Sequence, residues 1–140
     1  MGEQKTQKEK NILKSKDFST ALFVQHKQCW RNSILALITC LDEEWNYHEG
    51  FIVMKNPIIF LEHGWCESEE EIVDVTLPEE NLIYVTAVSF SYEDTYENVV
   101  NEWNIPFLQH TSSFRNSRYF FEALQQAQAV CEQHKKGVIV

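Results

Sequence analysis

Glycine, long apolar runs and positive charge are all scarce in this sequence. Only 4 of its 140 residues are glycine, and they form neither a Gly-rich phosphate loop nor a dinucleotide-binding fingerprint. No stretch approaches the roughly 18 consecutive apolar residues of a membrane-spanning helix. The 12 basic residues are outnumbered by 21 acidic ones, which gives a formal net charge of -9. Because nucleic-acid binders neutralise phosphates with broad basic surfaces, we expect no nucleic acid and no membrane as a partner.

Paired cysteine motifs are also missing. The four cysteines include no Cys-x-x-Cys pair, which argues against a zinc ribbon and a thioredoxin-type redox site. The first segment, Met1 to Asp17, is polar and Lys-rich and lacks the apolar core of a secretory signal. We therefore expect a cytoplasmic protein whose cysteines are reduced thiols. These cysteines are Cys29, Cys40, Cys66 and Cys131.

The residues that are present are typical of a globular domain. Hydrophobic residues make up 44% of the chain and aromatic residues 13%, which is enough for a packed core. The chain contains no internal repeat at a fixed period. We predict that residues 18–140 form one domain, preceded by a mobile polar arm over residues 1–17.

The strongest helical signal directly follows Cys29. The run from Trp30 to Leu41 carries apolar residues at helical spacing, with further apolar residues off that stripe. A helix that is apolar around most of its girth is buried at the centre of a domain, so Cys29 would lie in the first turn of a central helix. Two more helices are predicted towards the C-terminus, from Glu93 to Trp103 and from about Ser117 to Lys136, with Gly137 as the stop of the second.

Runs of β-branched and aromatic residues between these helices predict strands. Turn residues separate the runs, which suggests an antiparallel meander of about four strands. Such a sheet needs a covering layer, and the central helix can provide it. The predicted fold class is therefore α+β, with the central N-terminal helix packed on an antiparallel sheet and with helices at the C-terminal end. The four runs are residues 50–55, 58–67, 71–77 and 82–90.

Cys29 is the candidate nucleophile of the chain. The thiolate and not the thiol attacks an acyl carbon, and the partial positive charge at a helix N-terminus stabilises a thiolate. Cys40 and Cys131 lie late in predicted helices and Cys66 lies in a predicted strand. In such places a cysteine is typically a small buried apolar residue, so position distinguishes Cys29 from the other three.

A reactive thiol needs a base, and the base needs a carboxylate that orients it. If Ser68 and Glu69 form a two-residue turn, His63 faces Asp74 on the neighbouring strand with their Cβ atoms about 5 Å apart. A different turn would change this register. We therefore predict a triad in which Cys29 is the nucleophile, His63 the base and Asp74 the orienting group.

The three residues stand in an ordered pattern. Cys29 is followed by His63-Gly-Trp65 and, one predicted hairpin later, by Asp74-Val-Thr76. This pattern resembles the core of transglutaminase-like proteins of the papain-like superfamily, where a Cys at a helix start precedes a His-x-Trp on one strand and an Asp-x-Thr on the next. The resemblance implies a papain-like fold and a Cys-His-Asp triad, which forms a thioester with an amide substrate and passes the acyl group to water or to an amine.

The same interpretation predicts a substrate site beside the triad. An oxyanion hole would use the backbone N–H of the nucleophile and a second donor, for which Gln25 and Gln28 are the candidates. Trp65 lies two residues after His63, on the same face of the predicted strand, and would form one wall of the site. Trp30 directly follows the nucleophile in the chain and would also contact the substrate. Because side chains fill all three catalytic roles, neither a metal nor an organic cofactor is called for. The expected substrate is a peptide or protein amide, or a similar acyl compound.

A metal site is one alternative. His63 and Cys66 form a His-x-x-Cys spacing, and Cys29 or Asp74 could complete the ligand set. Residues i and i+3 of a strand point to opposite faces, however, so His63 and Cys66 would not readily share a metal.

A catalytically silent binding module on the same fold is the other alternative. The acidic run from Glu67 to Glu71 could meet a basic partner, although a charged run at a turn is usually only solvated. Fast labelling of Cys29 by a thiol reagent at neutral pH would distinguish an enzyme from such a module.

Overall fold

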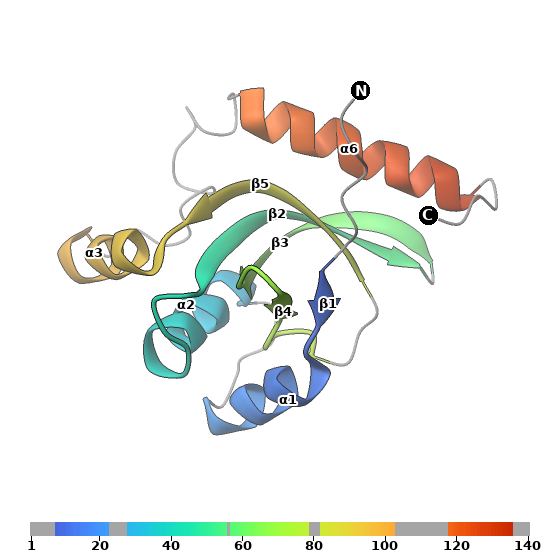
Figure 1. The fold of residues 1–140 in the computed structure, drawn as a ribbon. Helices are drawn as coiled ribbons and strands as arrows, with labels where there is room; N and C mark the ends of the chain where they lie inside the picture. Colours follow the sequence, from blue (N-terminus) through green and yellow to red (C-terminus); the bar gives the residue numbers. More distant parts are fainter. Residues whose placement is uncertain (1–7, 23–27, 56, 79–81, 103–117, 136–140) are drawn as a thin grey trace.

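Nine helices and strands cover most of the residues that can be described. The structure is a computed structural model that describes residues 8–22, 28–55, 57–78, 82–102 and 118–135 (Figure 1). Its fold class is α+β, as predicted. In chain order the elements are β1 (Glu9–Lys10), α1 (Ile12–Ala21), α2 (Cys29–Thr39), β2 (Asn46–Lys55), β3 (Ile58–Glu67), β4 (Glu71–Val73), β5 (Ile83–Phe90), α3 (Tyr92–Glu102) and α6 (Arg118–Lys135).

The strands form one mixed sheet in the order β1-β4-β3-β2-β5. β2 and β3 pair over their whole length, from Asn46 opposite Glu67 to Lys55 opposite Ile58. β5 is antiparallel to β2, and β1 is parallel to β4. The predicted antiparallel meander is therefore correct for β2, β3 and β4 but wrong for β5 and for the sheet as a whole. β4 is only three residues long and β1 takes its outer edge, whereas β2 offers β5 a long edge to pair with.

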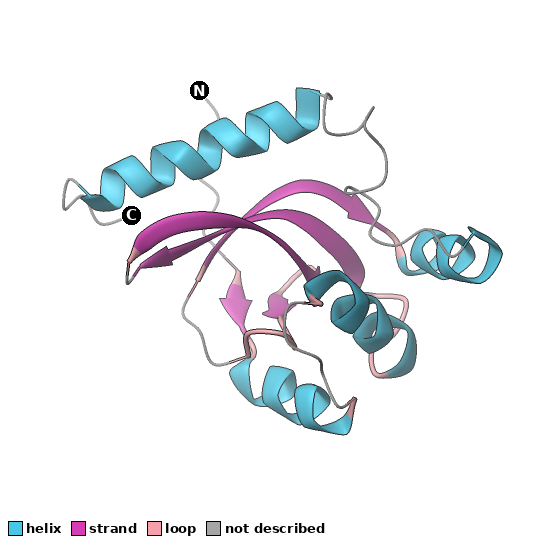
Figure 2. Cartoon of the chain, turned by 180° about the vertical axis from the view of Figure 1, so that it is seen from behind, coloured by secondary structure: helices cyan, strands magenta, loops and turns pink. Residues whose placement is uncertain are grey.

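Helices cover both sides of the arched sheet. α6 lies along one side, while α1 and α2 lie on the other (Figure 1), and Figure 2 shows the same arrangement from behind. None of the described helices combines the length and the apolar character needed to cross a bilayer. α2 packs its apolar residues against one core cluster and α6 packs against another. The first cluster contains Ile34, Ala36, Leu37, Trp45, Tyr47, Cys66, Val73 and Val75, and the second contains Phe51, Val53, Val85, Ala123, Ala127 and Cys131.

The N-terminal segment corrects the predicted arm over residues 1–17. Residues 1–7 lie outside the described part of the chain, but the remainder of this range forms β1 and the first part of α1. Asn11 begins the helix, because its side-chain oxygen accepts a hydrogen bond from the backbone N–H of Lys14 at 2.9 Å. Its own backbone N–H donates to the carbonyl of Ile72 at 2.8 Å, which attaches the segment to β4.

Charge explains why this polar segment docks. The lysines that suggested a mobile arm lie against the acidic hairpin between β3 and β4. The ammonium group of Lys8 is 2.9 Å from a carboxylate oxygen of Glu67, and that of Lys14 is 3.8 Å from a carboxylate oxygen of Glu71. The segment buries few apolar side chains, so its hydrophobic pattern gives no signal of docking.

We expect Ser15→Ala to lower the free energy of unfolding by about 1–3 kcal/mol. The Ser15 hydroxyl is fully buried, donates to the carbonyl of Asn11 at 2.7 Å and accepts the backbone N–H of Asp74 at 3.1 Å, so its removal leaves a buried N–H without an acceptor. Urea unfolding measures the loss. Ser19→Ala, on the same helix, is the matched control and should change stability by less than about 0.5 kcal/mol. Equal stabilities of the two variants would show that α1 is not docked as described.

Candidate active site

α2 begins at Cys29, as predicted, so the thiol lies at the positive end of the helix dipole. The residue before it, Gln28, is the N-cap, but its side chain makes no capping hydrogen bond. The first backbone N–H groups of a helix have no partner within the helix, so the N–H groups beside the sulfur are suited to bind a developing negative charge. Cys29 as a residue is partly exposed.

His63 and Asp74 form a buried hydrogen-bonded pair. Imidazole Nε2 of His63 is 2.8 Å from carboxylate Oδ2 of Asp74, and the two residues are 7% and 0% exposed. The other carboxylate oxygen, Oδ1, accepts the backbone N–H groups of Thr76 and Leu77 at 3.2 Å each. Hydrogen bonds of this kind stabilise the ionised form of a carboxyl group, so Asp74 is a buried carboxylate with a histidine as its counter-ion.

The register behind this contact corrects the prediction. The backbone N–H of Ser68 donates to the carbonyl of Glu71 at 2.9 Å, so the turn residues are Glu69 and Glu70 and not Ser68 and Glu69. Consequently Cys66 pairs with Val73, and β4 ends before Asp74. One further pair in this register would place Asp74 opposite Trp65. Trp65 and His63 are two residues apart on β3 and therefore point to the same face of the sheet. The carboxylate of Asp74 thus still lies on the same side of the strand as the imidazole.

The electrostatics of the pair favour a protonated His63. Burial alone would lower the pKa of the imidazole. The charge of Asp74 and its hydrogen bond, followed by a hydrogen bond and a charge interaction with Cys29, outweigh burial and raise the pKa to about 10. Burial alone would also raise the pKa of Asp74, but the charge and hydrogen bond of His63 outweigh it and hold that pKa below its ordinary value. Since Asp74 occupies Nε2, the nitrogen left to face Cys29 is Nδ1.

Two polar residues of α2 fix Cys29 relative to this pair. The side-chain amide of Asn32 donates to the Thr76 hydroxyl at 3.1 Å, beside Asp74, and the Ser33 hydroxyl donates to the Gly64 carbonyl at 2.9 Å, next to His63. Sequence reasoning missed both residues. The available signal was the polar run Arg31-Asn32-Ser33 in the first turns of a mostly apolar helix, because polar residues on its buried side must be hydrogen-bonded.

Gly64 leaves room for the Tyr47 side chain of β2. A Cβ atom at this position would lie 2.8 Å from the Tyr47 hydroxyl, which is too close, and 3.4 Å from Cα of Trp30, which is an ordinary contact. A side chain here would therefore displace Tyr47, which is fully buried in the core cluster under α2. The glycine in His63-Gly-Trp65 thus preserves the packing next to His63.

The predicted substrate residues have different surroundings. Trp65 is fully buried and stacks on His63 with ring centroids 6.2 Å apart, while its indole N–H donates to Glu67 at 2.7 Å. It supports the imidazole but offers no surface to a substrate. Trp30 is partly buried against the core cluster under α2, and Gln28 is partly buried at the start of the helix. Gln25 lies outside the described residues.

The described residues provide no ligand set for the alternative metal site. The thiol of Cys66 donates to the carbonyl of Ser33 at 3.2 Å, and burial raises its pKa well above the ordinary value, so it stays protonated. His63 is engaged by Asp74 and Cys29. In the described part of the chain no three His, Cys, Asp or Glu side chains are grouped as metal ligands.

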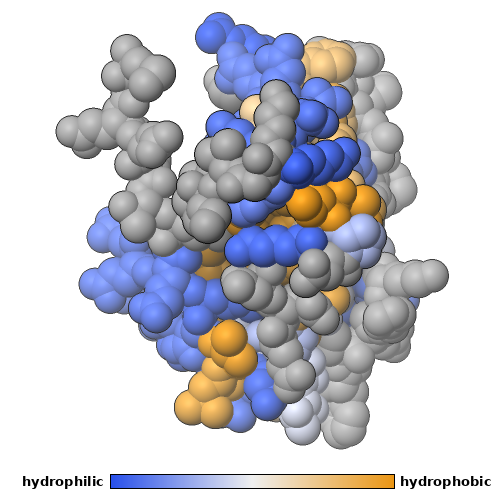
Figure 3. Space-filling view, turned by 90° about the vertical axis from the view of Figure 1, so that its right-hand side faces the viewer, coloured by the Kyte–Doolittle hydropathy of each residue, from blue (hydrophilic) through white to orange (hydrophobic). Residues whose placement is uncertain are grey.

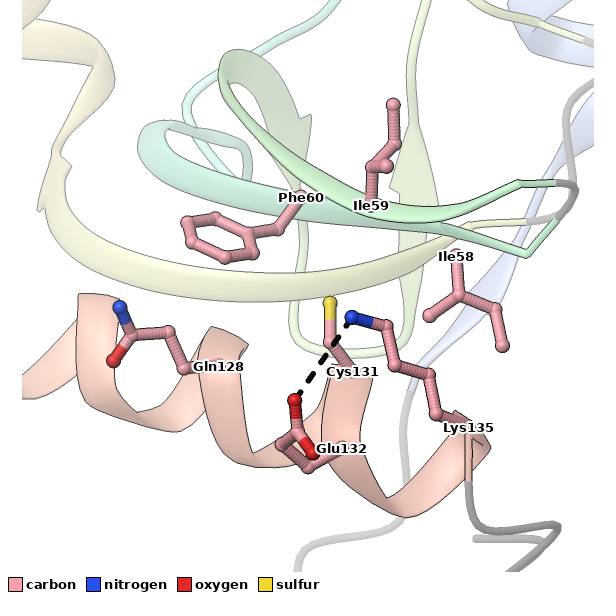
Figure 4. Close-up of a pocket in the computed structure, with 7 residues that line it drawn as sticks. All are labelled: Ile58, Ile59, Phe60, Gln128, Cys131, Glu132 and Lys135. Atoms are coloured by element: carbon pink, nitrogen blue, oxygen red, sulfur yellow. Dashed lines mark ion pairs between the residues drawn. The ribbon is translucent and has the colours of Figure 1, made fainter.

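A surface pocket lies away from the triad, where the start of β3 meets the end of α6. In Figure 4, Ile58 and Phe60 of β3 lie on the side of α6, while Ile59 points away from the helix. In the view of Figure 3, apolar patches are separated by hydrophilic side chains. The pocket contains none of the predicted site residues. It is lined by Ile58, Ile59, Phe60, Gln128, Cys131, Glu132 and Lys135.

Comparison of the chain with protein-family models, with characterised proteins and with solved structures gives no match. The functional interpretation therefore depends on the geometry of Cys29, His63 and Asp74 and on their motif.

We expect the free energy of unfolding to fall as the pH rises from about 7 to 10. In the unfolded chain His63 has its ordinary pKa of 6.5, but in the folded protein the pKa is about 10, so between these values only the folded state holds the proton. The contribution is fully present below pH 6.5 and is lost as the pH passes through 10, roughly 5 kcal/mol in all.

Urea unfolding of wild type and of Asp74→Asn across this pH range measures the effect. Other titrating groups are common to both proteins, so their contributions cancel in the comparison. The asparagine variant should be less stable at neutral pH and should lose less stability on going to pH 10. An identical pH dependence in the two proteins would mean that Asp74 does not hold the proton on His63.

Proposed function

We propose that the protein is a thiol-dependent acyltransferase or amide hydrolase, with Cys29 as nucleophile, His63 as acid and base, and Asp74 as orienting group. One observation carries the proposal. A partly exposed thiol at a helix N-terminus lies close enough to His63 to affect its pKa, and Nε2 of that histidine is 2.8 Å from a buried carboxylate. This arrangement provides every group that acyl transfer through a thioester requires.

The first half of the proposed reaction forms the thioester. The Cys29 thiolate attacks the acyl carbon of an amide, and the carbonyl oxygen takes up the negative charge beside the first N–H groups of α2. As the tetrahedral intermediate collapses, the bond between carbon and nitrogen breaks, and Nδ1 of His63 gives its proton to the departing amine. Asp74 remains ionised and stabilises the imidazolium before that step.

The second half releases the acyl group. Water or an amine attacks the thioester carbon, and the now neutral His63 accepts a proton from the attacking molecule. The bond between carbon and sulfur then breaks and Cys29 leaves as a thiolate, which restores the starting ion pair. Water as acceptor gives hydrolysis or deamidation, and an amine gives a new amide bond. The side-chain roles are the same in both outcomes.

The proposed substrate is a peptide or protein amide or a similar acyl compound. The proposed fold is of the papain and transglutaminase type. The ordered motif Cys29, His63-Gly-Trp65 and Asp74 supports this assignment, because its three polar members meet in space. A net charge of -9 favours neutral or basic substrates by steering. All four cysteines are free thiols, and the mechanism requires a reduced Cys29, so we propose a reducing compartment such as the cytoplasm.

The acidic hairpin offers less free charge than a catalytically silent binding module would need to meet a basic partner. Of the run from Glu67 to Glu71, the two end residues contact the N-terminal segment through Lys8 and Lys14. Only Glu69 and Glu70 are exposed at the turn. The charge that would meet a basic partner is therefore smaller than the sequence suggests.

Trapping of an acyl adduct tests the proposed function. We expect small thioesters and peptide amides to acylate wild type and Cys40→Ala, detected by intact mass and mapped to Cys29, and to leave Cys29→Ala unmodified. His63→Ala should acylate at least about tenfold more slowly because it lacks the acid and base. Turnover that survives Cys29→Ala, or activity lost with a stoichiometric metal on chelation, would overturn the thiol mechanism. An intact fold with no adduct from any donor would show that the protein is a binding module.

A further inference from the structure

Tyr84 of β5 shares the carboxylate oxygen that holds His63. Its hydroxyl donates to Oδ2 of Asp74 at 2.8 Å, the same distance as that from Nε2 of His63 to the same oxygen. One oxygen therefore has two donors from two different strands. Tyr84 was not part of the predicted triad, and it lies within a predicted strand where a tyrosine is expected as ordinary core.

The surroundings of Tyr84 fix the direction of its hydroxyl. The ring is 9% exposed and lies against Trp65, with centroids 4.9 Å apart. The ammonium group of Lys10 lies over the ring at 5.7 Å from its centroid. Burial, followed by the charge of Asp74, raises the pKa of the phenol far above its ordinary value. The hydroxyl is thus a permanent donor at any pH at which the protein functions.

We propose that Tyr84 is a fourth, positioning member of the site, whose hydroxyl competes with His63 for Asp74 and thereby allows the imidazolium to release its proton. This inference rests on the proposed function for its catalytic meaning, but its geometry is independent of it. A carboxylate that accepts a second hydrogen bond is a weaker base towards the first donor. Tyr84 therefore limits how tightly Asp74 holds the proton of His63.

The competition matters for acid catalysis in particular. Proton transfer to a departing amine is efficient when the pKa of the acid is not far above the working pH. A buried pair of His63 and Asp74 without Tyr84 would hold its proton more tightly, so thioester formation from an amide would slow. Alkylation of Cys29 by iodoacetamide needs no proton donation by His63 and should be little affected.

Tyr84→Phe tests the proposal because it removes the hydroxyl and keeps the ring. We expect the pKa of His63, followed by NMR titration of its imidazole, to rise by about 0.5 unit or more. Thioester formation from a peptide amide should slow severalfold at unchanged alkylation rate. The control is Tyr92→Phe, which also loses one hydroxyl hydrogen bond, to the carbonyl of Ile38 at 3.4 Å, and should leave the titration of His63 unchanged.

A second variant keeps the test decisive if the phenylalanine protein does not fold. Fluorotyrosine at position 84 retains the hydroxyl and is a stronger donor, so the pKa of His63 should fall instead of rise. An unchanged His63 titration in both folded variants, or shifts in the reverse directions, would overturn the proposal. Because the titration needs no substrate, it separates a failure of this inference from a failure of the proposed function.

Discussion

The buried ion pair of Asp74 and His63 is the interaction on which the rest of the structure depends. A fully buried carboxylate is tolerated only when it is paired and hydrogen-bonded, and removal of one partner typically costs about 3–5 kcal/mol. Each neighbouring element contributes to meeting that requirement. α1 holds the backbone of Asp74 through Ser15, the turn after β4 donates two backbone N–H groups, and β5 provides Tyr84.

The same network places the thiol. Asn32 and Ser33 attach the first turns of α2 to the turn that carries Asp74 and to the strand that carries His63. Apolar residues in place of Asn32 and Ser33 could stabilise the core about as well. Their hydrogen bonds, however, fix the position of the start of α2, and therefore of Cys29. Catalytic groups act efficiently when their geometry is set before the substrate arrives. Under the proposed function, α2 is a rigid support for the sulfur atom of Cys29.

Local patterns allowed much of this arrangement to be predicted, and long-range contacts account for what was missed. Apolar periodicity located α2, and a run of β-branched and aromatic residues between turn residues gave the bounds of β3. Position in the helix singled out Cys29 as the candidate nucleophile. The contact of His63 with Asp74 was expected from a register that proved wrong, and it exists because the shifted register keeps both residues on one side of the sheet. Tyr84 was missed because its partner lies on another strand and no spacing rule links them. α1 was missed because only Phe18 and its C-cap residue Leu22 pack against the core cluster, while hydrogen bonds and charge supply its other contacts and leave no hydrophobic period.

If His63 and the start of α2 activate one particular thiol, the relative alkylation rates of Cys29 and Cys40 show it. Both thiols are partly exposed, and they stand at opposite ends of α2, so Cys40 is an internal control. With iodoacetamide at about pH 7, followed by peptide mapping, we expect Cys29 to react at least about tenfold faster than Cys40. In His63→Ala the difference should shrink to severalfold or less. Equal rates in wild type, or a ratio unchanged by His63→Ala, would show that His63 does not activate Cys29.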